Sequence, residues 1–425
     1  MSELNQLLQT YCPNGVEYKK LGDFATISRG GNFQKKDFID SGIPCIHYGQ
    51  IYTRYGLFAD KTFTFISPDC AKKQKMAVTN DIVMAVTSEN IEDVCKCIAW
   101  LGSEPAAVSG HTAIIHHNQD AKYLVYYLHS EMFFAQKRKI AHGTKVIEVT
   151  PDKLNDIIIP LPPLEIQREI VRILDNFTRL TAELSAELSA ELSARQKQYS
   201  HYREKLLSFH PSIKWMSIGE LCKNITSGGT PLSGISEYYN GNIPWLRTQE
   251  INWRDIYDTS VKITQDGLEN SSAKWIPENC VIVAMYGATA AKCAINKIPL
   301  TTNQACCNLE IDKNIALYRY VFHWISKEYS SIKALGQGSQ SNINAKIIKQ
   351  YKIPVPPLDV QQRIVNVLDN FDAICSDLNI GLPAEISARQ KQYEYYRDLL
   401  LSFKNIDNIT DRQTDRQTDR QTEHN

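Results

Sequence analysis

The feature that most constrains this chain is a segment of 50 residues that occurs twice. Residues 160–209 begin P-L-P-P-L-E-I-Q-R-E-I-V-R-I-L-D-N-F and later read S-A-R-Q-K-Q-Y, and residues 354–403 repeat both blocks with few changes. The two copies align without a gap, and 28 of the 50 aligned positions are identical, which indicates an internal duplication. The chain is therefore expected to fold as two equivalent halves.

Each repeated segment is predicted to form a long helix. The pairs Pro162-Pro163 and Pro356-Pro357 prevent helix before them, and Glu165 and Asp359 then fall in the first turn, where the helix dipole favours acids. Apolar residues recur at spacings of three and four, so each helix carries an apolar stripe, and the stripes are expected to pack as an antiparallel coiled coil. The first stripe includes Ile170, Leu174, Phe177, Leu180, Leu184, Leu188 and Leu192.

The two helical segments differ at one place. Thr181 to Leu192 is a continuous run of T-A-E-L and S-A-E-L tetrads, whereas the second segment has Gly381-Leu382-Pro383 at this point. Glycine and proline are poor helix formers, so the second helix is expected to be kinked or interrupted there.

The segments before the helices, residues 1–159 and 210–353, share an order of landmarks. Gly30-Gly31 corresponds to Gly228-Gly229, Ile43-Pro44 to Ile243-Pro244, and a buried strand over 81–86 to one over 280–285. Helices are expected over 122–134 and 316–325. Most residues between the landmarks differ. The predicted fold is α+β: two similar α/β domains with unlike surfaces, joined by two long helices with pseudo-twofold symmetry.

Composition excludes some classes of protein. The formal net charge of zero excludes a non-specific polycation, although local basic patches remain available for nucleic acid. No run of about 18 apolar residues and no signal-peptide pattern is found, so neither a membrane span nor export is expected. The eleven cysteines lack the spacing of a disulfide framework, which favours reduced thiols and a cytoplasmic location.

No motif for catalysis or a cofactor is found. The chain lacks a G-x-x-x-x-G-K-[ST] phosphate loop and the Asn/Asp-Pro-Pro-Tyr/Phe tetrad of amino-methyltransferases, and Gly336-x-Gly338 is too short to indicate a nucleotide site. Cys95, Cys97, His111 and His116 fit no zinc template, and because free cysteines are commonly buried, the cysteines of this pattern and Cys306-Cys307 are expected in the core. We therefore predict neither an enzyme nor a metal protein.

The duplicated helices, the P-L-P-P-L-x-x-Q-x-x-I-V boundary and the tetrads together resemble one family. The chain resembles the DNA specificity subunit of type I restriction-modification enzymes, in the branch with tetrapeptide repeats between the target recognition domains. The resemblance covers nearly the whole chain except its tail. It implies target recognition domains at 1–159 and 210–353, conserved spacer helices at 160–209 and 354–404, and a disordered D-R-Q-T tail at 405–425.

The resemblance also implies function and partners. Each domain would read one half of an asymmetric, bipartite site in double-stranded DNA. The helices would dock methyltransferase (M) subunits, two in number, which bind S-adenosylmethionine and methylate adenine, and restriction/translocase (R) subunits would use ATP and magnesium. The specificity subunit itself would catalyse nothing and bind no cofactor or membrane. The alternative is a scaffold with two protein-binding modules on a coiled coil, without DNA specificity.

Candidate DNA contacts lie where the two domains differ most. Base edges are read by Arg, Lys, Asn or Gln, and phosphates are contacted by Lys or Arg. The candidates are Arg29, Lys35, Lys36, Tyr48, Arg54, Lys72, Lys73 and Lys75 in the first domain and Thr230, Arg247, Thr248, Gln249, Arg254, Lys274 and Tyr286 in the second. Lys145 and the loop 337–342 are weaker candidates.

Two hypotheses concern the repeats. One tetrad rotates the apolar stripe by about 40° and advances it by about 6 Å, and one base pair rotates B-DNA by about 34–36°. The tetrads are therefore expected to set the spacer between half-sites. The three D-R-Q-T units of 411–422 can be encoded by a GACA repeat, which suggests a slippage-prone tract at the end of the gene.

Overall fold

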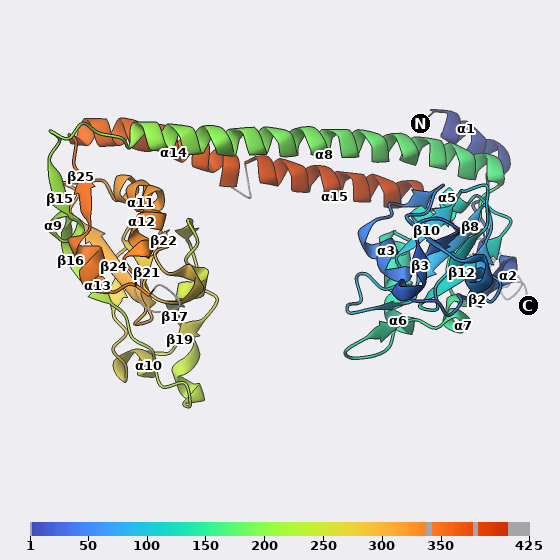
Figure 1. Ribbon diagram of the computed structural model, residues 1–425, viewed down its shortest axis with the longest axis horizontal. Helices are drawn as coiled ribbons and strands as arrows, with labels where there is room; N and C mark the ends of the chain where they lie inside the picture. The colour runs from blue at the N-terminus through green and yellow to red at the C-terminus, as the bar shows by residue number, and fades with distance from the viewer. Residues whose placement is uncertain (1, 337–341, 377–380, 407–425) are drawn as a thin grey trace, which may run out of the picture. The chain divides into compact units, whose positions relative to one another are not determined.

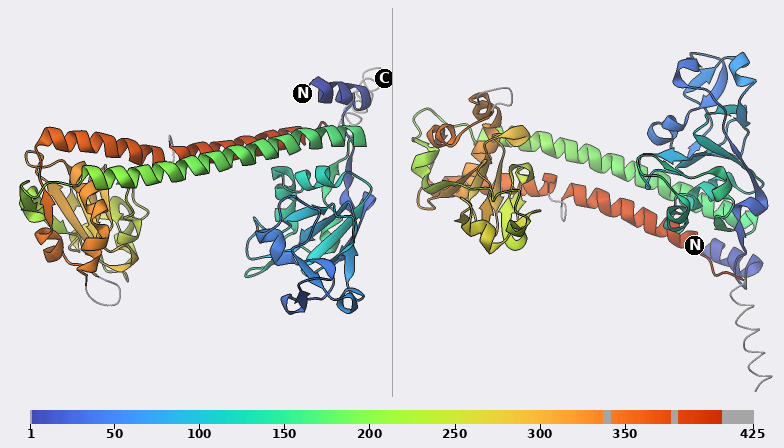
Figure 2. Two further views of the ribbon diagram at one scale, coloured as in Figure 1. Left: turned by 45° about the horizontal axis from the view of Figure 1, so that its top comes forward. Right: turned by 90° about the horizontal axis from the view of Figure 1, so that it is seen from below.

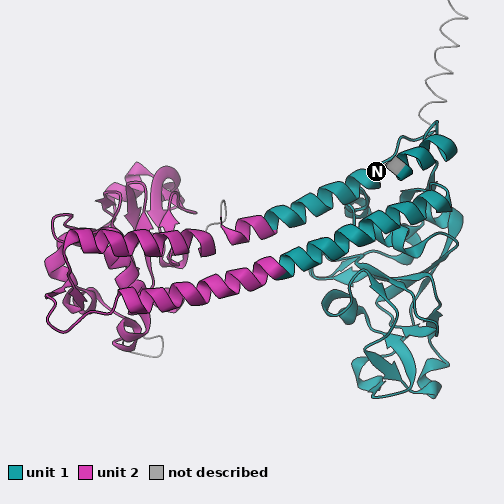
Figure 3. Cartoon of the chain, turned by 90° about the horizontal axis from the view of Figure 1, so that it is seen from above, with its two compact units in different colours: residues 1–186, 387–425 teal, residues 187–386 magenta. Residues whose placement is uncertain are grey.

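The computed structural model describes residues 2–336, 342–376 and 381–406, so the predictions for the tail and for most of the loop 337–342 lie outside the described residues. The chain divides into two compact units (Figure 3). Unit 1 comprises Met1–Ala186 and Ser387–Asn425, and unit 2 comprises Glu187–Ile386.

Unit 1 is built on two five-stranded sheets (Figure 1). The first sheet, in spatial order, consists of β2 (Ala25–Arg29), β12 (Thr112–His117), β8 (Asp81–Ala85), β10 (Cys97–Trp100) and β5 (Phe58–Ala59). The second consists of β3 (Phe38–Ile39), β6 (Thr64–Ile66), β4 (Ile43–Ile46), β11 (Ala106–Val108) and β7 (Lys75–Ala77). Two short ribbons pair β1 (Tyr18–Lys20) with β14 (Ile158–Pro160) and β9 (Thr87–Ser88) with β13 (Ile147–Glu148).

Strand β8 lies between two apolar cores, which explains the unbroken apolar run that follows Asp81 in this strand. Ile82 and Met84 belong to the core on one face of the strand, and Val83 and Ala85 belong to the core on the other. All five residues of β8 are buried, so the predicted buried strand is confirmed. A strand covered on both faces has no polar side and therefore does not alternate.

The helices of unit 1 flank these sheets and contribute to the larger core. They are α1 (Ser2–Tyr11), α2 (Leu21–Phe24), η1 (Lys35–Asp37), α3 (Tyr48–Thr53), α4 (Pro68–Ala71), α5 (Ala121–Tyr127), α6 (Glu131–Ile140) and α7 (Pro151–Leu154). The single helix predicted over 122–134 is wrong, because the structure has α5 and α6 there. Ser130 starts the second helix, since its Oγ accepts the N–H of Phe133 at 3.3 Å.

Unit 2 repeats the first sheet of unit 1 strand for strand, but its second sheet has four described strands instead of five. Its first sheet consists of β16 (Cys222–Ser227), β24 (Cys306–Ile311), β21 (Val281–Ala284), β22 (Cys293–Asn296) and β18 (Asp255–Ile256). Its second consists of β19 (Lys262–Ile263), β17 (Tyr239–Leu246), β23 (Leu300–Thr302) and β20 (Trp275–Ile276), and β15 (Trp215–Ser217) pairs with β25 (Lys352–Pro354). Strand β21 is buried on both faces, as β8 is in unit 1.

The short helices of unit 2 also follow the order found in unit 1. They are α9 (Ile218–Leu221), η2 (Ser236–Tyr238), η3 (Thr248–Glu250), α10 (Gln265–Glu269), η4 (Gly287–Thr289), α11 (Tyr318–Lys327), α12 (Tyr329–Ala334) and α13 (Ala345–Gln350). The helix predicted over 316–325 is α11, shifted by two residues.

The repeated segments form the long helices α8 (Leu164–Leu206), α14 (Leu358–Ser376) and α15 (Leu382–Leu400). Helix α8 is continuous over 43 residues, a length of about 65 Å. In the second segment, residues 377–380 lie outside the described part, and α15 begins at Leu382, directly after the non-helical Gly381, at the place where an interruption was predicted. Residues 164–186 of α8 belong to unit 1, and its remaining residues belong to unit 2.

Within each unit, α8 packs against the second helical segment. In unit 1, α15 runs antiparallel to α8 (Figure 1). Two contacts show this direction: the rings of Phe177 and Tyr396 lie 6.2 Å apart between centroids, and Thr178 Oγ1 lies 3.0 Å from the Tyr393 hydroxyl. In unit 2, the rings of Tyr199 and Tyr202 stack on Phe371 of α14. The predicted packing of the long helices is confirmed.

The apolar stripe of α8 is covered unevenly. Ile170 and Leu174 are fully buried against the core of unit 1, but Phe177 and Leu180 remain 37% and 50% exposed. Beyond the globular core, α8 packs against the neighbouring helix. One helix covers only part of another's surface, so the apolar stripe of α8 is partly exposed there.

A glutamine in each repeated boundary joins the long helix to its domain. Gln167 is fully buried; its Nε2 donates to Pro162 O at 2.7 Å and its Oε1 accepts the N–H of Asp120 at 3.1 Å. Gln361, also fully buried, donates to Pro356 O at 2.9 Å and accepts the N–H of Leu317 at 2.9 Å. These bonds give a physical reason for the glutamine in both copies of P-x-P-P-L-x-x-Q.

The first and last described residues of unit 1 lie together (Figure 2). Leu4 of α1 and Leu401 belong to the same core, and the N–H of Val16 donates to Lys404 O at 2.8 Å. All eleven cysteines are free thiols. Among the described residues, no helix is long and apolar enough to cross a membrane.

Candidate nucleic-acid interface

Both units hold a set of loops on the same backbone hydrogen bonds. Ile46 O accepts the N–H of Ser109 at 3.1 Å, and Leu246 O accepts the N–H of Asn303 at 3.0 Å. The bond from Gly31 N–H to Val108 O, 2.6 Å, likewise matches the bond from Gly229 N–H to Thr302 O, 2.9 Å. The residues that follow these anchors therefore occupy equivalent places in the two units.

Glycine is required at the start of this set of loops. A Cβ added at Gly30 or at Gly228 would overlap the carbonyl oxygen of Ser109 or Thr302. Only glycine permits so close an approach of two backbones. The predicted Gly-Gly landmarks thus hold the loops that carry several candidate residues.

In unit 1 the loops gather aromatic and basic side chains, which we call the first cluster: Arg29, Lys35, His47, Tyr48 and His111. The Tyr48 ring lies 4.6 Å from the His47 ring and 4.9 Å from the His111 ring, measured between centroids. Arg29 Nε donates to Gly110 O at 2.9 Å, next to His111. These residues come from the end of β2, from η1, from the start of α3 and from the loop before β12.

The first cluster is only partly free to meet a ligand. Arg29 is half-exposed but also forms an ion pair with Glu148 at 2.9 Å. His47 is 7% exposed, and burial, together with the charges of Lys35 and His111, lowers the pKa of its imidazole below the ordinary value. Tyr48 and His111 remain accessible and can offer ring faces and polar edges to a base.

In unit 2 the equivalent loops gather a different set, the second cluster: Thr230, Arg247, Thr248, Tyr286 and Gln304. The hydroxyl of Thr230 donates to Gln304 Oε1. The carbonyl of Thr248 accepts the hydroxyl of Thr289 at 2.9 Å, which ties η3 to η4, the helix that follows Tyr286. The Tyr286 side chain is 43% exposed. Each cluster has one arginine and one tyrosine, but the first adds a lysine and two imidazoles, whereas the second adds two threonines and a glutamine.

The other predicted residues lie around or away from these clusters. Lys73 and Lys75 flank Gln74, which contacts Gly31, and Lys274 follows Ala273, which contacts Gly229, so these three lie beside the loops. Gln249, in η3, is exposed beside Thr248. Lys36 is exposed on η1 next to Lys35.

Three candidates are placed elsewhere. Lys72 forms an exposed ion pair with Asp69 at 2.9 Å. Arg54 ends α3 and lies over the Phe63 ring, 5.6 Å from its centroid. Arg254 is exposed, and its carbonyl accepts the N–H of Ile295 of β22. Among the weaker candidates, Lys145 is exposed, and Asn342 Oδ1 accepts the N–H of Gly287 at 3.2 Å, beside Tyr286.

Several cluster residues were absent from the list of DNA candidates drawn from the sequence. They are His47, His111 and Gln304, and the sequence analysis considers His111 only as part of a metal pattern. The sequence did carry a signal for His47, because it stands three residues after Ile43-Pro44, as Arg247 does after Ile243-Pro244. No pattern in the sequence linked His111 or Gln304 to these loops.

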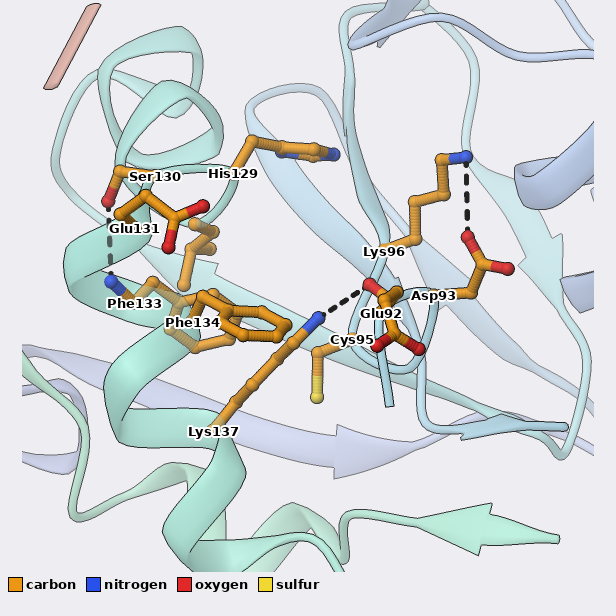
Figure 4. Close-up of a pocket in the computed structure, with 11 residues that line it drawn as sticks. Glu92, Asp93, Cys95, Lys96, His129, Ser130, Glu131, Phe133, Phe134 and Lys137 are labelled. Carbon is orange, nitrogen blue, oxygen red and sulfur yellow. Dashed lines mark hydrogen bonds and ion pairs between the residues drawn. The ribbon is translucent and has the colours of Figure 1, made fainter. Parts of the chain in front are cut away.

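A hollow in unit 1 that contains a buried lysine is a competing candidate site (Figure 4). It has a volume of about 340 Å³ and is lined by Lys137, Lys96, Asp93 and Ser130, among others. Lys137 Nζ donates to the carbonyls of Glu92 and Val94, each at 2.8 Å, and burial lowers the pKa of Lys137. Because its buried cation is already bonded to the backbone, the hollow offers little to a ligand.

The cysteine and histidine pattern does not form a metal centre in the part of the chain that the structure describes. His116 Nδ1 lies 2.6 Å from Asp81 Oδ1, and His111 Nδ1 lies 3.2 Å from Thr87 Oγ1. Burial raises the pKa of the Cys95 thiol to about 12, so it stays protonated and is a poor nucleophile.

Comparisons with known proteins identify the family. The family model described as "Type I restriction modification DNA specificity domain" matches twice, over residues 13–194 and 212–388. The specificity subunit of the type I restriction enzyme EcoR124I/EcoR124II from Escherichia coli is 41% identical over 261 residues, which cover 59% of this chain and 63% of that protein. The alignment thus spans less than two thirds of this relative.

Solved structures show the same fold. A chain from a study of complex assembly and conformational transition of the type I R-M system aligns with a TM-score of 0.63 and 16% identity, covering 91% of this chain and 97% of that one. The HsdS subunit from Thermoanaerobacter tengcongensis aligns with a TM-score of 0.52 and 15% identity, covering 92% and 96%. With two matches of the family model across most of its length, the chain belongs to the type I restriction-modification DNA specificity subunit family.

Proposed function

We propose that this chain is a non-catalytic subunit that recognises an asymmetric, bipartite site in double-stranded DNA. The observation that supports this most is the pair of clusters held on equivalent backbone bonds but built from unlike side chains. Identical frames with different polar groups suit two half-sites of different sequence. The domains proposed to bind them are residues 1–159 and 210–353.

The same proposal gives the helices a partner. Helices 160–209 and 354–404 would dock two methyltransferase subunits, and restriction/translocase subunits would join the complex. Exposed apolar side chains on these helices support a docking role, among them Tyr395 at 64%, Leu399 at 53% and Leu180 at 50% exposure. Exposed aromatic and aliphatic groups are common at protein interfaces.

Cofactors would belong to the partners in this scheme. S-adenosylmethionine would be bound by the methyltransferase subunits that modify adenine, and ATP and magnesium by the restriction subunits. The proposed location is the cytoplasm, where free thiols such as the eleven of this chain stay reduced.

We also assign the chain to the branch of the family with tetrapeptide repeats. Helix α8 continues without a break through the tetrads of Thr181–Leu192. Each tetrad adds about 6 Å and about 40° of rotation to such a helix. In the proposed complex, the number of tetrads would set the length of the spacer between the half-sites.

Modification-aware sequencing of host DNA with and without the gene tests the proposal. A split, adenine-methylated motif should be present with the gene and absent without it. If the motif persists after deletion, and the full chain shows neither salt-dependent affinity for DNA nor a co-purifying methyltransferase, the chain is a protein-binding scaffold instead.

A further inference from the structure

The residue that follows β4 in unit 1 and the residue that follows β17 in unit 2 occupy the same backbone position. His47 and Arg247 directly follow the anchor carbonyls of Ile46 and Leu246. Their backbones are nearly the same, with φ and ψ of −99° and 137° at His47 and −106° and 153° at Arg247. Each starts a short helix, and the fourth residue of that motif, Gln50 or Glu250, accepts its N–H. The two side chains therefore leave the chain at equivalent points.

In unit 1 this position is closed to a ligand. The His47 side chain is 7% exposed and lies against the rings of Phe33 and Phe38, with centroids 6.5 and 5.8 Å away. Its Nδ1 accepts the N–H of Gly49 at 3.2 Å. The imidazole is therefore an internal part of the first cluster.

In unit 2 the same position carries the guanidinium of Arg247, which forms no ion pair within the described residues. Arg247 is half-buried, and its Nη2 donates to Ser260 Oγ at 3.4 Å. The nearby Glu250 uses its two carboxylate oxygens on the N–H groups of Arg247 and Ser260. Within the described residues, Arg247 forms no ion pair, and its buried Nε has no hydrogen-bond partner.

The setting of Arg247 distinguishes base reading from phosphate contact. A phosphate can be met by a flexible, exposed cation, but reading a base requires a guanidinium plane held in a fixed orientation. Arg247 is held at one end by Ser260, and its turn is tied to η4 by the Thr248–Thr289 bond. Its Nε is buried, but Nη1 and the second N–H of Nη2 form no hydrogen bond within the described residues.

We infer that Arg247 reads a guanine in the half-site bound by the second domain, donating two N–H groups to guanine O6 and N7. This pairing is the usual bidentate contact of arginine in the major groove. The inference rests on the proposed function and adds the base and the residue that recognises it. The first domain has no equivalent contact, because His47 fills that place.

The test uses the full chain in complex with its methyltransferase subunits. Binding is measured on a panel of duplexes in which each base pair of the second half-site is changed in turn. Arg247→Met should abolish the preference for guanine at one position, a loss of about 5- to 150-fold in discrimination. Arg247→Lys keeps the charge but lacks the planar fork, so it should lose the same preference while retaining the wild-type salt slope.

Arg254→Met is the matched control, because Arg254 is an exposed arginine of the same unit that lies outside the second cluster. It should leave the guanine preference intact. The inference is overturned if Arg247→Met weakens all duplexes evenly and lowers the salt slope by about one, which would mark a phosphate contact. It is equally overturned if both Arg247 variants keep the wild-type base preference. A wild-type complex that discriminates no sequence would instead refute the proposed function.

Discussion

The buried glutamine at each helix boundary allows a sharp test of how the long helices are joined to the domains. We consider Gln361→Leu in unit 2, where the side chain is fully buried. Its Oε1 accepts the N–H of Leu317, and its Nε2 donates to Pro356 O at 2.9 Å and Ile315 O at 3.2 Å. Leucine has a similar volume, so the change removes the hydrogen bonds while keeping most of the packing.

The magnitude follows from the groups left without partners. A buried donor or acceptor that loses its partner costs about 1–3 kcal/mol. Pro356 is buried, whereas Leu317 and Ile315 are half-buried and can regain some contact with water. We therefore expect Gln361→Leu to lower the free energy of unfolding by about 2–4 kcal/mol, with most of the loss from Pro356 O and the Leu317 N–H.

Urea denaturation and hydrogen exchange measure this effect. The exchange of the Leu317 amide should accelerate in the variant, because its acceptor is gone. Gln362→Leu is the matched control: it is the same substitution one residue later, where the side chain is exposed and, among the described residues, bonds to Asn366 alone, at 2.7 Å. Equal unfolding free energies for the two variants, with the Leu317 amide still protected in Gln361→Leu, would refute the reasoning.

Three further predictions concern the glycine at the start of the loops, the loss of folding stability at low pH and the tetrads. Gly228→Ala should destabilise unit 2 by about 1–3 kcal/mol in thermal unfolding, because its Cβ would overlap Thr302 O, whereas Gly234→Ala, which meets nothing within 4 Å, should be neutral. Burial lowers the pKa of His117 to about 4. The neutral form is therefore favoured in the folded state, and stability should fall as pH drops from about 6.5 towards 4, by up to about 3 kcal/mol; His117→Asn should show a shallower pH dependence of unfolding. Deletion of Ser185–Leu188 should change the spacer of the methylated motif by about one base pair, and an unchanged spacer would exclude the tetrads as its ruler.

The candidate site was accessible to sequence reasoning only where the two halves could be compared. Arg247, Thr248, Thr230 and Tyr286 follow landmarks that recur in both halves, and the structure places them on loops linked by the Leu246–Asn303 and Thr248–Thr289 bonds. Lys72 and Arg54 were chosen by charge alone, and contacts with Asp69 and Phe63 occupy their side chains. Charge along a chain does not show which neighbour lies beside it in space.

The histidines illustrate the same limit. His111 looked like one member of a cysteine and histidine pattern, yet its ring lies beside Tyr48, which is 63 positions earlier in the chain. That pairing depends on the loop before β12 and the start of α3 meeting across two sheets. The contact between His111 and Tyr48 cannot be predicted from the spacing of residues along the chain, because residues from separate loops are brought together only by the fold.

The sequence by itself determined the duplication, the two long helical segments, the start of a new helix after Gly381 and the buried strands β8 and β21. These features depend on local periodicity, on proline and glycine, and on apolar content, all of which can be read along the chain. Only the tertiary structure decided that one equivalent position holds an enclosed histidine and the other an arginine without an ion pair. The physical reason is that enclosure and charge balance depend on residues far away in sequence, here Phe33 and Phe38 around His47 and Ser260 beside Arg247.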